Sequence, residues 1–108
     1  MKAKLDLITP GTILQEEFLE PLGITAYKLS KGIKVQQTAI GQIVKGKRKI
    51  SVDMALRFSR YFGNSPQFWL NLQNQYDLEL EKEKKDNLFT EIVPCNHVAE
   101  RAIHYRCD

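Results

Sequence analysis

The stretch AYKLSKGIKVQQTAIGQIVK, residues 26–45, decides the fold because its apolar residues are spaced as two short helices crossing at a steep angle require. Counted from Ala26 as position 1, apolar side chains stand at positions 4, 8, 10, 15 and 18: Leu29, Ile33, Val35, Ile40 and Ile43. The first two share one face of a first helix, the last two share one face of a second, and the third fills the corner between them. This spacing is typical of a helix-turn-helix motif.

The polar residues of the second helix, expected over residues 36–44, point away from that core and form a candidate surface for DNA bases. They are Gln36, Gln37, Thr38 and Gln42. Glutamine can pair with adenine N6 and N7, and threonine can offer its hydroxyl or its methyl group to thymine. An idle surface helix can also carry glutamines, and that alternative stays open. Gly41 has two interpretations, close approach to DNA and plain helix packing.

The positive charge of the chain is concentrated on this motif and on the residues directly after it. Residues 25–60 carry nine basic groups and one acidic group, a net charge of +8, whereas the whole chain carries +3. Such a patch attracts a polyanion, and its position favours duplex DNA over a merely lysine-rich solvated surface. The expected phosphate contacts are Lys28, Lys45, Lys47, Arg48 and Lys49.

The turn between the two helices departs from the common pattern at one position. Many such motifs have a glycine at position 9, because the backbone there tends to adopt a positive φ. This chain has Lys34 at that position and a glycine at Gly32, two residues earlier. We therefore expect that the turn is built differently.

Capping signals place three further helices around the motif. The first starts at about residue 12 with Thr12 as its cap and Gln15 completing a capping box, and Pro21 and Gly23 end it. Ser51 begins a helix over residues 52–62, and the Ser-Pro pair at 65–66 begins another that ends at about residue 83. The sequence thus predicts an all-α, compact five-helix domain built around the helix-turn-helix motif, over residues 1–85, with a C-terminal tail over 86–108.

Aromatic and aliphatic residues at helical spacing mark the last of these helices. They are Phe68, Trp69, Leu72 and Tyr76. Aromatic residues in this pattern more often belong to a core or a dimer interface than to a ligand site. We expect these four residues at a dimer interface.

The remaining sequence favours neither an enzyme nor a metal protein. No paired carboxylates, phosphate loop or nucleophile with a base stands in a folded region, so we expect no catalytic residues and no cofactor. Potential zinc ligands occur only near the C-terminus, in a spacing that matches no common finger, so no metal site is predicted: Cys95, His97, His104 and Cys107. We expect residues 95–108 to be mobile or weakly docked. With no long apolar run and no signal peptide, a cytoplasmic protein without a membrane partner is expected.

Three segments carry a resemblance to a known family: GKRKIS (46–51), ALRFSRYFGNSPQFWLNLQ (55–73) and YDLE (76–79). Over roughly residues 7–85 the chain resembles the HigA-type antitoxins, a branch of the phage-repressor-like helix-turn-helix proteins (the XRE or Cro-CI group). The resemblance implies a homodimer that binds double-stranded operator DNA, represses its own operon and neutralises a RelE-like ribonuclease toxin, HigB. Two alternatives remain: a stand-alone transcriptional repressor, and a protein-interaction module that has lost DNA binding.

Overall fold

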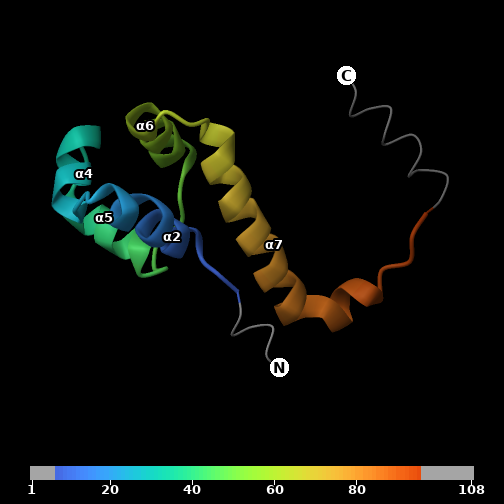
Figure 1. Ribbon diagram of the computed structural model, residues 1–108. Coiled ribbons are helices and arrows are strands. Elements are labelled where there is room, and N and C mark those ends of the chain that lie inside the picture. The colour runs from blue at the N-terminus through green and yellow to red at the C-terminus, as the bar shows by residue number, and fades with distance from the viewer. Residues whose placement is uncertain (1–6, 96–108) are drawn as a thin grey trace, which may run out of the picture.

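The computed structural model describes residues 7–95, and these form five helical segments with no strand among them (Figure 1). The first segment is a continuous run of α2 (Pro10–Ile13), the π-helix η1 (Leu14–Leu19) and α3 (Glu20–Leu22). The other four are α4 (Ala26–Ile33), α5 (Gln37–Val44), α6 (Val52–Phe62) and α7 (Pro66–Thr90). The all-α, five-helix prediction is confirmed.

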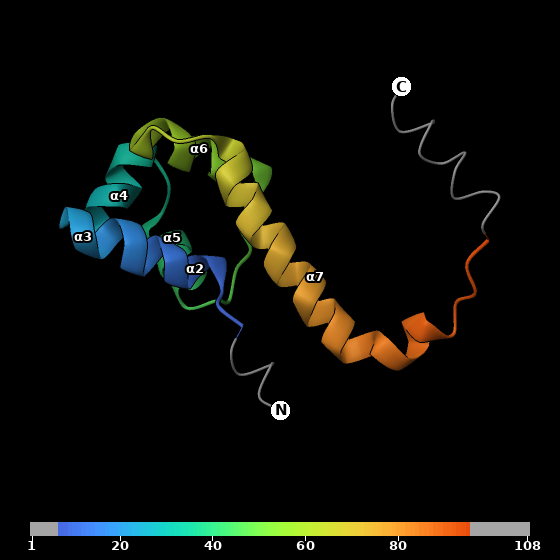
Figure 2. The same ribbon diagram turned by 45° about the vertical axis from the view of Figure 1, so that its right-hand side comes forward.

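The helices α4 and α5 pack against each other as the helix-turn-helix pair, and the other elements surround them. The N-terminal run contacts both α5 and α7 through α2, while α6 packs on α4 and α7. Figures 1 and 2 show α7 leaving this body and extending well beyond it, so that only its first half is covered by other helices.

The apolar residues that define the motif form the centre of the core. Leu29, Ile33, Ile40 and Ile43 are buried, and Val35 packs half-buried against them. Their burial confirms the face assignments made from spacing alone, including the corner position of Val35. The rest of the core comes from the flanking helices, chiefly Leu14, Phe58 and Trp69.

The N-terminal helix starts three residues earlier than expected. Thr9, not Thr12, is the cap: its Oγ1 accepts from the Thr12 N–H at 3.2 Å, and Pro10 occupies the first helical position. The predicted capping box of Thr12 and Gln15 is therefore wrong. Proline is favoured at this place because its missing N–H would have no partner there.

Pro21 does not end the helix, because a π-helical stretch precedes it. A proline inside an α-helix crowds the carbonyl four residues earlier and removes one hydrogen bond. Here the Glu20 N–H donates to the Gln15 carbonyl, five residues back. We attribute this wider turn to the proline, since π-bulges accommodate such residues. The helix continues to Leu22 and ends at Gly23, whose φ is +65°.

The two later helices begin as predicted, but the last one is longer. Ser51 and Ser65 accept from the N–H groups of Met54 and Phe68. The helix α7 passes residue 83 and is interrupted at Lys85 (φ −123°, ψ 23°) before it continues to Thr90. Lys85 also pairs with Glu81, and this hydrogen bond and the nearby positive charge hold the pKa of the Glu81 carboxyl below its ordinary value.

Trp69 belongs to the core of its own chain, which corrects its assignment to a dimer interface. Its side chain is 0% exposed, its ring lies 4.8–5.0 Å from those of Phe18, Phe58 and Phe68, and its Nε1 donates to Asn64 Oδ1 at 3.0 Å. A fully buried ring with a satisfied N–H offers nothing to a partner. The sequence pattern could not separate a core face from an interface face on the same helix.

Gly11 lies against the backbone of α5 at a distance that excludes any side chain. A Cβ placed on Gly11 would stand 1.8 Å from the Ile43 carbonyl oxygen and 2.9 Å from the Val44 Cα. Because both of these atoms belong to the backbone, no rotamer change can relieve the overlap. This contact fixes how closely the N-terminal run approaches α5.

We predict that Gly11→Ala lowers the free energy of unfolding by about 3 kcal/mol, because the helices must separate to admit one methyl group. The matched control is Gly41→Ala on α5, where a Cβ would meet nothing within 4 Å. That change raises stability by about 1 kcal/mol through helix propensity. Urea unfolding of wild type, Gly11→Ala and Gly41→Ala measures both changes in the free energy of unfolding. Equal unfolding midpoints for Gly11→Ala and wild type would contradict the packing argument.

Candidate nucleic-acid interface

The outward face of α5 carries all four residues expected to contact bases. Gln37, Thr38 and Gln42 are exposed on the helix, and the exposed Gln36 is its N-cap residue, with extended backbone angles and no side-chain capping bond. The helix therefore presents these polar groups side by side. No part of this surface is occupied by another described element.

Gly41 lies in the middle of this outward face, and its surroundings separate its two interpretations. A Cβ there would meet nothing within 4 Å, so packing inside the chain does not require a glycine. A glycine in a helix interior costs about 1 kcal/mol against alanine. No packing contact within residues 7–95 compensates this cost.

The turn before α5 is built at Lys34 and not at Gly32. Lys34 has φ +62° and ψ +49°, and it is the one residue other than glycine with a positive φ among residues 7–95. This left-handed conformation costs about 1–2 kcal/mol for a residue with a Cβ. Gly32 serves packing instead, because a Cβ there would stand 2.4 Å from the Tyr61 ring. The expectation of a differently built turn is wrong.

The predicted phosphate contacts lie at the two ends of the motif. Lys28 is exposed in the first turn of α4, and Lys45 is exposed at the end of α5. The backbone then turns at Gly46 (φ +77°), and the Lys47 N–H donates to the Gln42 carbonyl at 2.8 Å. Residues 46–49, called the basic loop here, project Lys47, Arg48 and Lys49 into solvent.

The basic loop is anchored to α7 by a buried amide that sequence analysis did not identify. Gln73 is 7% exposed; its Oε1 accepts from the Ile50 N–H at 2.8 Å, and its Nε2 donates to Asp77 Oδ1 at 3.0 Å. Asp77 Oδ2 lies 3.4 Å from the Lys49 Nζ. A glutamine at helical spacing among apolar residues of α7 was the available signal. These contacts make the position of the loop depend on α7.

An open hollow of about 520 Å³ lies where α4 meets the start of α5. Its lining combines Tyr27 and Lys31 with the turn residue Lys34, the N-cap residue Gln36 and the first residue of α5, Gln37. Lys31 also stands 5.4 Å above the Tyr27 ring. Polar and cationic groups thus surround the N-terminal end of α5, which is the end that enters the groove in helix-turn-helix proteins.

The four residues of zinc-ligand type near the C-terminus, for which no metal site is predicted, fall mostly outside the part of the chain that the structure describes. Cys95 is exposed, whereas His97, His104, Cys107 and the rest of residues 96–108 lie beyond the described range. Residues 7–95 contain no group of three or more side chains placed to hold a metal ion. Within the same range, no helix combines the length and the apolar character that crossing a membrane requires.

Comparisons with known proteins agree with this geometry. A family model described as helix-turn-helix matches residues 16–69. The chain is 42% identical over 87 residues to virulence-associated protein I of Dichelobacter nodosus, a match that covers 81% of each chain. It is 34% identical over 77 residues to antitoxin HigA-1 of Vibrio cholerae, covering 71% of this chain and 72% of that relative.

One solved structure extends the likeness to three dimensions. The Pseudomonas aeruginosa antitoxin HigA, solved with the higBA promoter, is 38% identical and superposes with a TM-score of 0.77, over 82% of this chain and 96% of that chain. The resemblance identified from residues 46–51, 55–73 and 76–79 is thereby confirmed.

Proposed function

Because this chain belongs to the helix-turn-helix family and resembles its HigA-type antitoxins, we propose that it is an antitoxin. In this role it binds operator DNA as a dimer, represses its own operon and neutralises a ribonuclease toxin of the HigB type. Membership of this family agrees with the expectation that the chain is not an enzyme. The toxin and the dimer rest on the resemblance, while DNA binding has independent support from the site.

A single observation carries the DNA-binding proposal: an outward polar helix face lies between basic groups that have few acidic partners. Among the phosphate-contact candidates, Lys49 alone has an ion pair within residues 7–95. Gln37, Thr38 and Gln42 can then reach base edges in the major groove while the basic loop contacts phosphates. This division assigns sequence recognition to α5 and most of the electrostatic affinity to the loop.

The proposed dimer uses side chains in the first half of α7 that remain partly exposed in a single copy of the chain. Phe68 is 37% exposed, and Leu72 and Tyr76 are half-buried, so these three side chains retain surface that a second copy can cover. Two copies place their recognition helices about 34 Å apart in successive major grooves. Occupying the promoter in this way excludes polymerase.

Two other functions remain distinguishable from this one. A stand-alone repressor has the same DNA surface without a toxin, and an interaction module has the same fold without operator binding. The basic loop, in which Lys49 alone has an ion pair within residues 7–95, favours DNA binding over the interaction module. The presence or absence of a neighbouring toxin gene separates the antitoxin from the stand-alone repressor.

We predict that base and phosphate contacts respond differently to mutation. Gln37→Ala reduces affinity for the chain's own promoter while it leaves affinity for scrambled DNA unchanged, and the cost is about 1–3 kcal/mol. Lys47→Gln weakens binding to both DNAs alike and lowers the salt slope by about one. Gel shifts at two salt concentrations measure these effects, with Gln67→Ala on the exposed side of α7 as the control. Absence of any promoter-specific band for wild type at low salt would overturn the DNA-binding proposal.

We predict that Gly41→Ala changes stability and DNA binding in opposite directions. The added methyl group has no atom of residues 7–95 within 4 Å, so the helix gains about 1 kcal/mol in stability. On the DNA side the same methyl group stands between α5 and the groove floor and weakens promoter binding. Calorimetry and gel shifts on one preparation give both values, and unchanged promoter affinity would show that Gly41 does not mark the point of closest approach.

We predict that the product of an adjacent toxin-like gene co-purifies with this chain and that co-expression restores growth. Size-exclusion chromatography of the co-expressed pair and a growth-rescue test measure the two outcomes. The control is Lys47→Gln, which loses DNA affinity but keeps rescue if neutralisation does not require promoter binding. Failure of both co-purification and rescue would leave the stand-alone repressor as the better function.

A further inference from the structure

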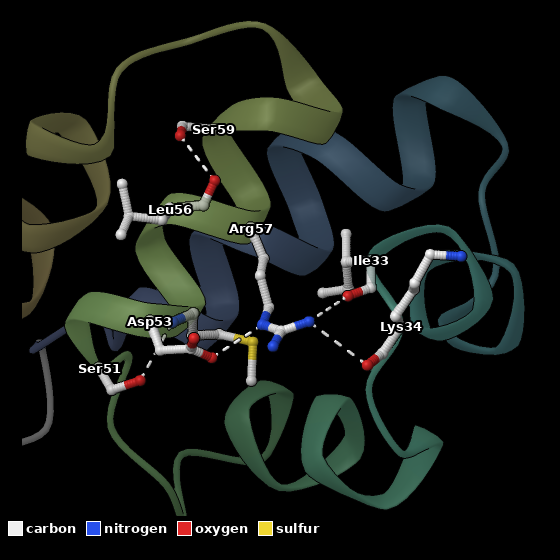
Figure 3. Close-up of polar contacts among 8 residues, drawn as sticks. Ile33, Lys34, Ser51, Asp53, Leu56, Arg57 and Ser59 are labelled. Atoms are coloured by element: carbon white, nitrogen blue, oxygen red, sulfur yellow. Dashed lines mark hydrogen bonds and ion pairs between the residues drawn. The ribbon is translucent and has the colours of Figure 1, made fainter.

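The C-terminal end of α4 is closed by a side chain from another helix. Arg57 on α6 donates through Nη1 to the Ile33 carbonyl at 2.7 Å and to the Lys34 carbonyl at 3.4 Å (Figure 3). Its Nε donates to Asp53 Oδ2 at 2.8 Å, one turn earlier on α6. Figure 3 shows the guanidinium lying between the Asp53 carboxylate on one side and the two backbone carbonyls on the other.

These carbonyls are among the groups that a helix end leaves without partners. The Ser30 carbonyl already accepts from the N–H groups of Lys34 and Val35. The carbonyls of Ile33 and Lys34 accept their hydrogen bonds from Arg57 instead. A cation is also favoured at this end of the helix dipole. The guanidinium fork matches the arrangement, because its separate N–H groups reach the carboxylate and the carbonyls together.

The position of this contact gives it influence over α5. Lys34 holds the left-handed conformation that usually falls to glycine, and Gln36, two residues later, starts α5 without a side-chain cap. Only Val35 stands between Lys34, whose carbonyl Arg57 binds, and the N-cap residue Gln36. The direction in which α5 leaves the turn is therefore set by backbone angles next to the atoms that Arg57 holds.

We propose that Arg57, oriented by Asp53, is a positioning residue for operator recognition, which fixes the angle between α4 and α5 by holding the turn at Lys34. We call the hydrogen bonds from Arg57 to the Ile33 and Lys34 carbonyls the clamp. A glycine at residue 34 would adopt the left-handed conformation without strain, whereas lysine disfavours it. The clamp stabilises that conformation from outside the turn. Arg57 thus acts on DNA through α5 and not through a phosphate. This inference rests on the proposed DNA-binding function and deepens it.

The chain offers a matched control three residues further along the same helix. Arg60 is exposed, and its replacement also removes one positive charge from the neighbourhood of Lys34. Arg57→Met and Arg60→Met are compared by their ratio of affinity for the chain's own promoter to affinity for scrambled DNA. All measurements are made at a temperature where circular dichroism shows each variant to be folded.

We expect Arg57→Met to lower this ratio about tenfold, as the loss of a charge-assisted hydrogen bond at the turn implies. Arg60→Met lowers both affinities alike and leaves the ratio unchanged. Lys34→Gly, added to Arg57→Met, restores most of the ratio because glycine adopts the left-handed turn without the clamp. An equal ratio in Arg57→Met and Arg60→Met would overturn the proposal.

Two further measurements keep the test decisive. If Arg57→Met does not fold, Asp53→Asn takes its place: it releases the guanidinium while leaving its charge, so an unchanged ratio overturns the clamp and a reduced one supports it. If wild type shows no preference for its promoter, the proposed function fails and the clamp is judged by the coupling constant that reports φ at Lys34. A coupling constant at Lys34 that Arg57→Met leaves unchanged then overturns the clamp, and a changed coupling constant supports the clamp.

Discussion

The approach of Gly11 to the Ile43 carbonyl is the constraint on which the rest of the arrangement depends. With a Cβ position 1.8 Å from that oxygen, the N-terminal run approaches α5 too closely for any side chain at residue 11. The same run contacts α7 through α2, so the element that lies against the backbone of α5 is itself packed on the last helix of the described residues. Its outward face can remain polar because the inward face is fixed by backbone contact as well as by Ile40 and Ile43.

Features of the motif with a local or periodic cause were predictable from sequence. The five apolar positions of residues 26–45, the caps Ser51 and Ser65, and the exposure of the polar face of α5 all follow from helical spacing and capping chemistry. The start of the first helix did not follow, because Thr9 and Thr12 are both good caps. The close packing of Gly11 on α5 places that residue inside the helix and thereby favours Thr9.

The features that sequence analysis missed depend on contacts between distant residues. Gln73 and Arg57 each bind a backbone group 23 or 24 residues away, at Ile50 and Ile33. In the sequence Gln73 is one of many polar residues of its helix, and Arg57 is one of nine basic residues in a positive segment. Trp69 was assigned to a dimer interface because its position on the helix suits contact with a partner as well as it suits the aromatic cluster. Its contacts with the distant Phe18 and Phe58 place it in that cluster.

The two missed polar residues bracket α5 and connect it to different helices. Arg57 links the turn before α5 to α6, and Gln73 links the chain after the basic loop to α7. Lys49 adds an ion pair to Asp77, and since both groups are partly exposed, it contributes little stability and can exchange for a phosphate. If the proposed dimer forms through α7, the helix that joins the two copies also carries the acceptor that positions each basic loop. The spacing of the two DNA-binding surfaces is then set by one rigid element and one buried hydrogen bond, without a flexible linker between them.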